Sequence, residues 1–152
     1  LHTNTAAGAV VRMRDMGVES YLITSSVNGV LAQRLVRTLC KHCKTPLLPS
    51  DEVRQRTGLG RFLAAGQPMY QAVGCAQCRG TGYQGRTGIH ELLLLDETLR
   101  RAVIDGKDAS ILHGLAAKAG MLSLYEDGLR KVAAGVTSLD ELLRVTQDQN
   151  DA

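Results

Sequence analysis

The alternation of apolar and polar positions predicts two helices at the start of the chain. Apolar residues recur on one helical face of residues 6–17, and Gly17 stands where a helix C-cap is expected. A second helix is predicted to begin near Ser20 and to include the stretch YLITSSVNGVLAQ. The following stretch, RLVRTL at 34–39, interleaves β-branched and apolar residues with charges, which predicts a strand.

The middle of the chain reads as a small lobe followed by a buried strand. Proline and glycine punctuate residues 44–74 and leave room for one short helix, capped by Ser50. The glycine-rich stretch at 79–86 predicts a bend. The stretch TGIHELLLL at 87–95 then has the length and composition of a strand, although a run of leucines alone is also compatible with a helix.

From Asp96 onward the pattern is helical. Asp108 is a predicted N-cap, and Ser138 and Glu141 have the spacing of a capping box. The segments between these caps and the following glycines predict about four helices, at 96–106, 108–120, 123–135 and 137–147. The order of helices and strands therefore predicts an α/β fold that ends in a small helical domain.

Charge is divided unevenly along the chain. Residues 1–90 hold eleven Lys and Arg against four Asp and Glu, whereas residues 91–152 hold seven against eleven. This asymmetry indicates a basic lobe that faces phosphate, acidic protein or an anionic surface, or simply two ordinary solvated faces. With no Trp and one Phe, the chain lacks the aromatic platforms of single-strand nucleic-acid binders, and no partner of that class is expected.

All four cysteines fall in two Cys-x-x-Cys pairs, CKHC at 40–43 and CAQC at 75–78. Two such pairs supply four thiolates, the closed tetrahedral set that structural zinc prefers. The 31 residues between the pairs exceed a common spacer, but they can form a lobe. We therefore predict a structural zinc site with Cys40, Cys43, Cys75 and Cys78 as ligands.

Disulfides and a redox pair are the alternatives for these cysteines. No secretory signal or long apolar run is visible, so a reducing compartment is expected, and there paired Cys-x-x-Cys motifs favour metal. His42 lies between two of the cysteines and is expected to face solvent because four thiolates already complete the set.

Three stretches of the chain resemble the type II secretion ATPases. LHTNTA at 1–6 resembles the end of their histidine box, LAQRLVRTLC at 31–40 the entry to their tetracysteine motif, and GYQGRTGIHELL at 82–93 the exit from it. The resemblance implies a RecA-like ATPase domain interrupted by a zinc lobe and followed by a helical domain. The implied segments are an ATPase-core part at 1–39, the tetracysteine lobe at 40–78, a return strand at 79–95 and a helical C-terminal domain at 96–152.

The same resemblance implies a hexameric ATPase that drives pseudopilus assembly. Its implied place is the cytoplasmic side of the inner membrane, which it reaches through platform proteins rather than through a span of its own. The chain starts at Leu1 rather than Met and is expected to be a piece of a longer protein. No G-x-x-x-x-G-K-[ST] motif occurs in it, so ATP and Mg²⁺ are expected only in the full-length protein and not in this piece alone.

Two residues are candidates for the catalytic machinery. His2 matches the histidine-box position, which the resemblance places near the γ-phosphate, although a lone terminal His is also typical of plain exposure. Arg86 stands among glycines at a predicted exposed corner, where a guanidinium can contact ATP phosphate during phosphoryl transfer. A surface arginine in a flexible loop is the alternative for Arg86.

Three other functions compete with type II secretion. A type IV pilus assembly ATPase is the nearest. CAQCRGTG also fits one repeat of the DnaJ-type polypeptide-binding zinc domain, but CKHCKTPL does not supply a second repeat. A zinc-ribbon nucleic-acid module is supported by the basic first part of the chain and opposed by the missing aromatics.

Overall fold

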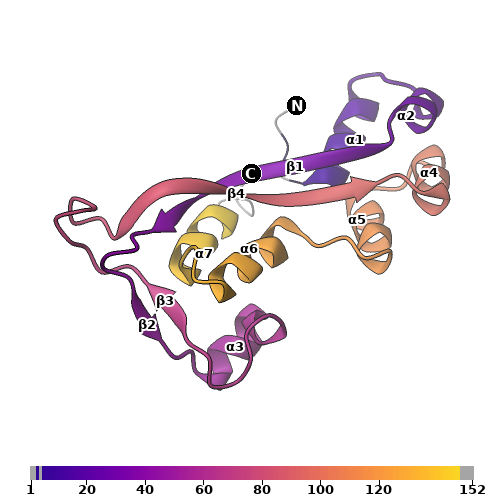
Figure 1. The fold of residues 1–152 in the computed structure, drawn as a ribbon. Coiled ribbons are helices and arrows are strands. Elements are labelled where there is room, and N and C mark those ends of the chain that lie inside the picture. The colour runs from indigo at the N-terminus through magenta and orange to yellow at the C-terminus, as the bar shows by residue number, and fades with distance from the viewer. Residues whose placement is uncertain (1–2, 4, 148–152) are drawn as a thin grey trace. The chain divides into compact units, whose positions relative to one another are not determined.

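The computed structural model describes residue 3 and residues 5–147, and the chain divides into two compact units. The first unit comprises residues 1–33 and 90–124, and the second comprises residues 34–89 and 125–152. Two long strands, β1 (Gly29–Leu39) and β4 (Tyr83–Leu94), pair in a two-stranded sheet and contribute residues to both units (Figure 1). Leu95 N donates to Asn28 O, which joins the start of β1 to the end of β4, and Cys40 N donates to Gly82 O, which joins the end of β1 to the start of β4. The two strands are therefore antiparallel.

The first unit packs four helices around one end of this strand pair. They are α1 (Ala6–Asp15), α2 (Ser20–Ser26), α4 (Glu97–Ile104) and α5 (Ala109–Lys118). Helix α1 packs on α5, and α4 contacts both α2 and α5. The fully buried side chains of this core include Val10, Ile23, Leu93, Leu99 and Leu112. Burial of such side chains is the main force that holds short helices of this kind in place.

The second unit contains a small hairpin and two further helices. Its elements are β2 (Thr45–Leu47), α3 (Asp51–Thr57), the 3₁₀ turn η1 (Leu59–Arg61), β3 (Met69–Gln71), most of α6 (Leu124–Ala133) and α7 (Leu139–Gln147). Strands β2 and β3 are antiparallel, with Pro46 opposite Tyr70. This pairing closes the segment between the two cysteine pairs into a lobe.

The helices predicted to begin near Asp96, Asp108 and Ser50 do begin there, and a side-chain oxygen caps each of them. Asp96 Oδ1 accepts from Leu99 N at 2.8 Å and Asp108 Oδ1 accepts from Ile111 N at 2.9 Å. Ser50 Oγ likewise accepts from Val53 N at 3.2 Å, so the single short helix predicted inside the lobe is confirmed. A capping side chain accepts from N–H groups that the first helical turn leaves unpaired. Because cap and N–H group lie within a few residues of each other, such caps can be predicted from the sequence.

The second predicted helix is too long. Helix α2 ends at Ser26, and Gly29 already begins β1, which runs five residues further upstream than the strand predicted at 34–39. The stretch from Gly29 to Leu39 finds a partner strand in β4, and ladder pairing overrides the local helical pattern. A partner more than 50 residues away is invisible to a local reading.

The predicted bend at 79–86 is shorter than expected. Strand β4 begins at Tyr83, so the strand predicted at 87–95 is confirmed and extended at its start. Arg86 therefore lies inside a strand and not at a corner of the chain. Gly85 retains a positive φ of 80°, a conformation that only glycine adopts freely, and it is accommodated within the strand.

Glu141 forms only half of the predicted capping box. Ser138 Oγ accepts from Glu141 N at 3.1 Å, but the Glu141 carboxylate pairs with two arginines. It accepts from Arg37 N at 2.7 Å and from both guanidinium groups, while its own side chain is fully buried. Glu141 thereby ties β1 to α7 within the second unit.

Candidate metal centre

The four cysteines are placed by the end of β1 and by the turn that precedes β4. Cys40 follows the last residue of β1, and its N–H donates to Gly82 O at 2.9 Å. Lys44 N donates to Cys40 O at 3.0 Å, which closes a turn around Cys43 before β2 begins. The β2–β3 pairing then returns the chain to Cys75, so residues 35 positions apart meet.

The four sulfur atoms all lie within 4.8 Å of one another. The Sγ–Sγ distance is 3.8 Å for Cys40 and Cys75, 3.8 Å for Cys43 and Cys78, and 3.7 Å for Cys75 and Cys78. A regular tetrahedron with zinc–sulfur bonds of about 2.3 Å has edges of about 3.8 Å. The sulfurs are therefore spaced as a four-thiolate zinc site requires.

These distances exclude disulfide bonds between the described cysteines. A disulfide needs sulfurs about 2.0 Å apart, and all four cysteines are free. Cys40 and Cys78 are buried, and Cys43 and Cys75 are partly buried. His42 is exposed and does not belong to the group, as predicted. Four protein thiolates leave no open coordination position, so a metal held here is structural.

Backbone N–H groups point at two of the sulfurs. Gly74 N donates to Cys43 Sγ at 3.3 Å, and Cys78 Sγ accepts from Cys75 N at 3.2 Å and from Gly82 N at 3.1 Å. Such donors stabilise thiolate charge and fix the orientation of the ligands.

The thiols differ in acidity because their surroundings differ. Burial raises the pKa of Cys78, but the N–H groups of Cys75 and Gly82, together with the thiols of Cys75 and Cys43, outweigh it and lower the pKa to about 6. For Cys43 the N–H of Gly74 lowers the pKa, whereas burial and the neighbouring cysteines together raise it to about 11. Four clustered thiols cannot all ionise by themselves, because the thiolate charges repel one another. A divalent metal ion bound among them would offset this repulsion.

Gly82 links the metal centre to the sheet, and only glycine fits there. Its φ is +82°, its N–H faces Cys78 Sγ, and its carbonyl accepts from Cys40 N. An added Cβ would lie 2.6 Å from Cβ of Ala72. The sequence showed Gly82 as one of several bend glycines, and only the tertiary structure singles it out.

We expect Gly82→Ala to weaken the centre more than Gly80→Ala. Both glycines have a φ near 80°, so both substitutions cost about 1 kcal/mol in backbone strain. A Cβ at Gly80 meets nothing within 4 Å, whereas the Ala72 clash adds about 1–3 kcal/mol at Gly82. Denaturant unfolding and zinc titration of both variants check this; equal losses at the two positions would contradict the packing argument.

Of the two predicted catalytic residues, the structure describes only Arg86. His2 lies outside the described residues. Arg86 is exposed on β4 and lines a pocket of about 260 Å³ together with Arg37, Thr81, Tyr83 and Gly85. The Arg37 guanidinium stacks on the Tyr83 ring, 4.1 Å from its centroid, and pairs with Glu141. Among the described residues the Arg86 guanidinium forms no hydrogen bond or ion pair, so its charge is available to an anion.

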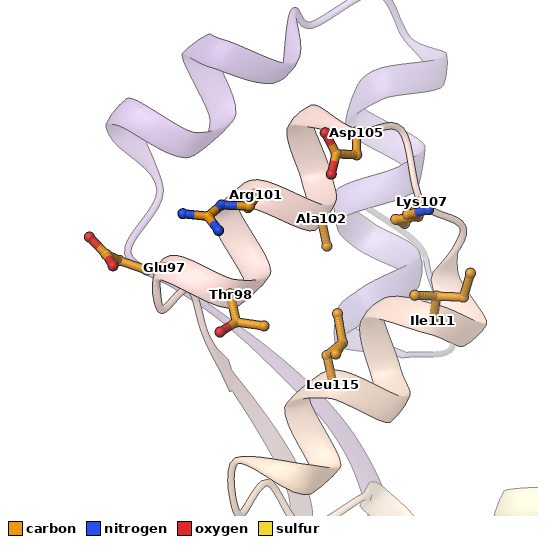
Figure 2. A pocket seen from close by; sticks show the side chains of 8 residues that line it. All are labelled: Glu97, Thr98, Arg101, Ala102, Asp105, Lys107, Ile111 and Leu115. Atoms are coloured by element: carbon orange, nitrogen blue, oxygen red, sulfur yellow. The ribbon is translucent and has the colours of Figure 1, made fainter.

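A second concave surface lies between α4 and α5 in the first unit (Figure 2). This groove of about 400 Å³ is lined by Glu97, Thr98, Arg101, Ala102, Asp105, Lys107, Ile111 and Leu115. Its lining mixes charges of both signs with apolar side chains and holds no set of metal ligands. Within the described part of the chain, the cysteine cluster is therefore the better-defined site.

Comparison with known proteins decides the family. A family profile described as "Type II/IV secretion system protein" matches residues 1–144. The chain belongs to this family. It is 49% identical over 150 residues to "Type II secretion system protein E" of Dickeya dadantii, a match that covers 98% of this chain and 29% of that protein. The resemblance inferred from the three motif stretches is thereby confirmed.

Further relatives come from both the secretion and the pilus branch of the family. "Type II secretion system ATPase E" of Vibrio cholerae is 49% identical over 152 residues, with 97% of this chain and 29% of that protein covered. "Type IV pilus assembly ATPase PilB" of Thermus thermophilus is 46% identical over 146 residues, with 96% of this chain and 16% of that protein covered. This family member thus spans less than a third of the length of these relatives.

Proposed function

We propose that this chain is the C-terminal part of an ATPase that powers type II protein secretion by driving pseudopilus assembly. The observation that carries the proposal is the family match over residues 1–144 together with the two Cys-x-x-Cys pairs that meet in one cluster. The relatives named for type II secretion support the same assignment.

The proposed organisation is a RecA-like core interrupted by a structural zinc lobe. Residues 1–39 and 79–95 belong to the core in this proposal, residues 40–78 form the lobe, and residues 96–152 form the helical C-terminal domain. Zinc held by Cys40, Cys43, Cys75 and Cys78 fixes where β1 ends and where β4 begins. The support is the spacing of the sulfur atoms, together with the Cys40 N to Gly82 O bond that joins the two strand ends.

ATP and Mg²⁺ belong to the full-length protein in this proposal. The chain holds no G-x-x-x-x-G-K-[ST] loop to cradle phosphates, so this piece does not hydrolyse ATP by itself. The parent acts as a homo-hexamer on the cytoplasmic side of the inner membrane and meets platform proteins there. In the described part of the chain, no helix has both the length and the apolar character needed to cross a bilayer.

Arg86 is the proposed phosphate contact, and its substitution tests this role. In the full-length protein, Arg86→Ala should lower kcat for ATP hydrolysis about 10- to 1,000-fold, as removal of a cation facing the transferring phosphoryl group does. Arg79→Ala, which removes an exposed arginine from the turn before β4, is the matched control and should change kcat by less than about twofold. Unchanged turnover in Arg86→Ala would retire the role.

A pilus assembly ATPase is the second candidate function, favoured by the 46% identity to PilB. The two functions separate in the parent organism. Deletion of the full-length gene should abolish export of a type II substrate and leave twitching motility intact if the first proposal holds. The reverse result would assign the chain to the pilus branch.

A further inference from the structure

The turn between α6 and α7 is polar but buried. We call residues 134–138, which join these two helices of the second unit, the α6–α7 turn. Thr137 is 0% exposed and Ser138 is 3% exposed. Polar side chains buried this completely need hydrogen-bond partners. Thr137 Oγ1 donates to Arg37 O on β1 at 2.7 Å, a few residues before the first cysteine. The turn is therefore held by the part of the chain that leads into the metal centre.

The first cysteine pair is flanked by two further donors to this turn. Leu39 N donates to Val136 O at 2.9 Å, and Lys44 Nζ donates to Gly135 O at 2.8 Å. Leu39 directly precedes the first cysteine of the pair, and Lys44 directly follows the second. Both ligands of this pair lie between the two donors, so the spacing of the donors depends on how the ligands are held.

Lys44 is part of a close contact between the β2–β3 hairpin and the turn. Its ammonium lies over the Tyr70 ring of β3, 4.6 Å from the centroid. Gly135 has a φ of +77°, and a Cβ added there would lie 3.1 Å from Tyr70 Cδ2 and 3.3 Å from Lys44 Nζ. A glycine at this position thus lets the turn approach both side chains of the hairpin.

The second cysteine pair reaches the turn through Tyr83. Gly82 N donates to Cys78 Sγ at 3.1 Å, and the hydroxyl of the next residue, Tyr83, shares a hydrogen bond of 2.6 Å with Ser138 Oγ. Ser138 Oγ also accepts from Glu141 N at 3.1 Å, in the first turn of α7. A continuous series of contacts therefore leads from the ligand Cys78 to the start of α7.

The segment between the cysteine pairs also contacts the start of α6. The Tyr125 hydroxyl donates to Thr57 O at 2.5 Å, and Arg61 forms an ion pair with Glu126. Both ends of α6 therefore touch residues that the cysteine pairs enclose or flank. None of the residues of α6, α7 or the turn between them is a metal ligand.

We propose that the metal centre also holds the α6–α7 turn, so that loss of zinc releases this turn and loosens α6 and α7. Bound zinc fixes the spacing of the four sulfurs. Without it the two cysteine pairs can separate, and the flanking donors Leu39, Lys44 and Tyr83 move with them. The inference rests on the zinc ligation in the proposed function and does not depend on ATP hydrolysis.

The first unit should keep its packing when zinc is lost. The members of its apolar core lie on α1, α2, α4 and α5, on the parts of β1 and β4 that belong to this unit, and in the segments next to these elements, and no cysteine is among them. A core that contains no ligand loses no contact of its own when the metal leaves. The proposed effect is thus confined to the second unit.

Hydrogen exchange of the zinc-loaded full-length protein tests the link. Removal of zinc by a strong chelator should speed exchange in a peptide covering residues 134–142 about tenfold or more, because its amides lose the structure that protects them. Exchange in a peptide covering residues 109–118, in α5, should stay within about twofold. Unchanged exchange at 134–142 after zinc removal would overturn the inference. Equal acceleration in both peptides would also overturn it, since the whole chain would then be unfolding.

Two substitutions test the contacts without changing a ligand. Lys44→Met removes the donor to Gly135 O and keeps an unbranched side chain, and Tyr83→Phe removes the hydroxyl bonded to Ser138 and keeps the ring. The double variant should hold about one zinc per chain, yet exchange at 134–142 should already be about three- to tenfold faster than in the wild type. Wild-type exchange in the zinc-loaded double variant would contradict the proposed link.

Lys41→Met is the matched control. It removes the same charge from an exposed position inside the first Cys-x-x-Cys pair, and exchange at 134–142 should stay at the wild-type level. If Lys41→Met speeds this exchange as much as the double variant does, the contacts with the turn are not responsible and the inference fails. A wild type that binds no zinc would defeat the zinc site of the proposed function, whereas a zinc-loaded wild type whose α6–α7 turn does not respond to the chelator would defeat this inference alone.

Discussion

Cys78→Ser is expected to abolish tight zinc binding and to unfold the lobe between the cysteine pairs. Cys78 is buried, and its sulfur accepts from the N–H groups of both Cys75 and Gly82, so among the described residues it has more backbone donors than the other three cysteine sulfurs. Serine offers a hard, protonated oxygen in place of a thiolate, which zinc disfavours in a four-sulfur set. Structural zinc contributes about 10–16 kcal/mol to small zinc-dependent folds, so the loss exceeds what the short β2–β3 hairpin can offset.

Zinc content and thermal unfolding of the purified protein check this expectation. The wild type should hold about one zinc per chain, and a strong chelator should lower its melting temperature by more than about 10 °C. The Cys78→Ser variant should hold little zinc and show no response to the chelator.

His42→Ala is the control for the cysteine substitution. His42 lies within the first Cys-x-x-Cys pair but is exposed and outside the ligand group. Its substitution should leave zinc content and melting temperature unchanged. Zinc loss in His42→Ala, or full zinc content in Cys78→Ser, would refute the four-cysteine assignment.

Glu141→Gln is expected to destabilise the second unit by about 1–3 kcal/mol, because it weakens charge-assisted hydrogen bonds to two arginines that are themselves half-exposed and stay hydrated. The Glu141 side chain is fully buried and pairs with Arg37 and Arg144. Burial raises its pKa, but hydrogen bonds from Arg144 and Arg37 outweigh burial and lower the pKa from 4.5 to about 2. The ionised form is therefore the one that the fold stabilises.

The sign of this shift fixes the pH dependence. A lowered pKa in the folded state contributes stability that is fully present above pH 4.5 and is lost as the pH falls toward about 2. The lowered pKa of Glu141 corresponds to a contribution of about 3 kcal/mol to the free energy of unfolding at neutral pH. Denaturant unfolding between pH 6 and pH 2 should show this loss in the wild type, and the loss should be absent in Glu141→Gln.

Asp140→Asn is the control for Glu141. It removes the same charge from the neighbouring, exposed position of α7, and surface changes of this kind usually alter stability by less than about 0.5 kcal/mol. A pH dependence that disappears equally in Asp140→Asn would show that the net charge of the unit, rather than the buried pair, is responsible.

The features that the sequence predicted correctly depend on short spacings. Helix starts at Ser50, Asp96 and Asp108 need only a side-chain oxygen three residues before an N–H group. The clustering of the four cysteines was predicted from two Cys-x-x-Cys pairs with no competing cysteine, and the structure brings their sulfurs together, whereas zinc as the bound metal stays a prediction. Each cap and each single Cys-x-x-Cys pair is complete within a few residues, so it can be recognised without knowledge of the fold.

The features that the sequence missed depend on distant partners. The upstream extension of β1 to Gly29 requires β4, and the placement of Arg86 within a strand follows from the same pairing. Glu91 carried one visible signal, since it is the charged residue on the apolar phase of TGIHELLLL, but its partner at the start of α1 is 85 residues away.

The sequence by itself thus determined the family, the four cysteines that cluster and the starts of the capped helices, because short motifs encode them. Only the tertiary structure showed which carboxylates are buried and which groups they form hydrogen bonds or ion pairs with. Glu141 belongs by spacing to a capping box, yet its carboxylate is committed to Arg37, 104 residues away. Desolvation makes such pairings decisive, because a buried charge must find its partner wherever packing has placed one.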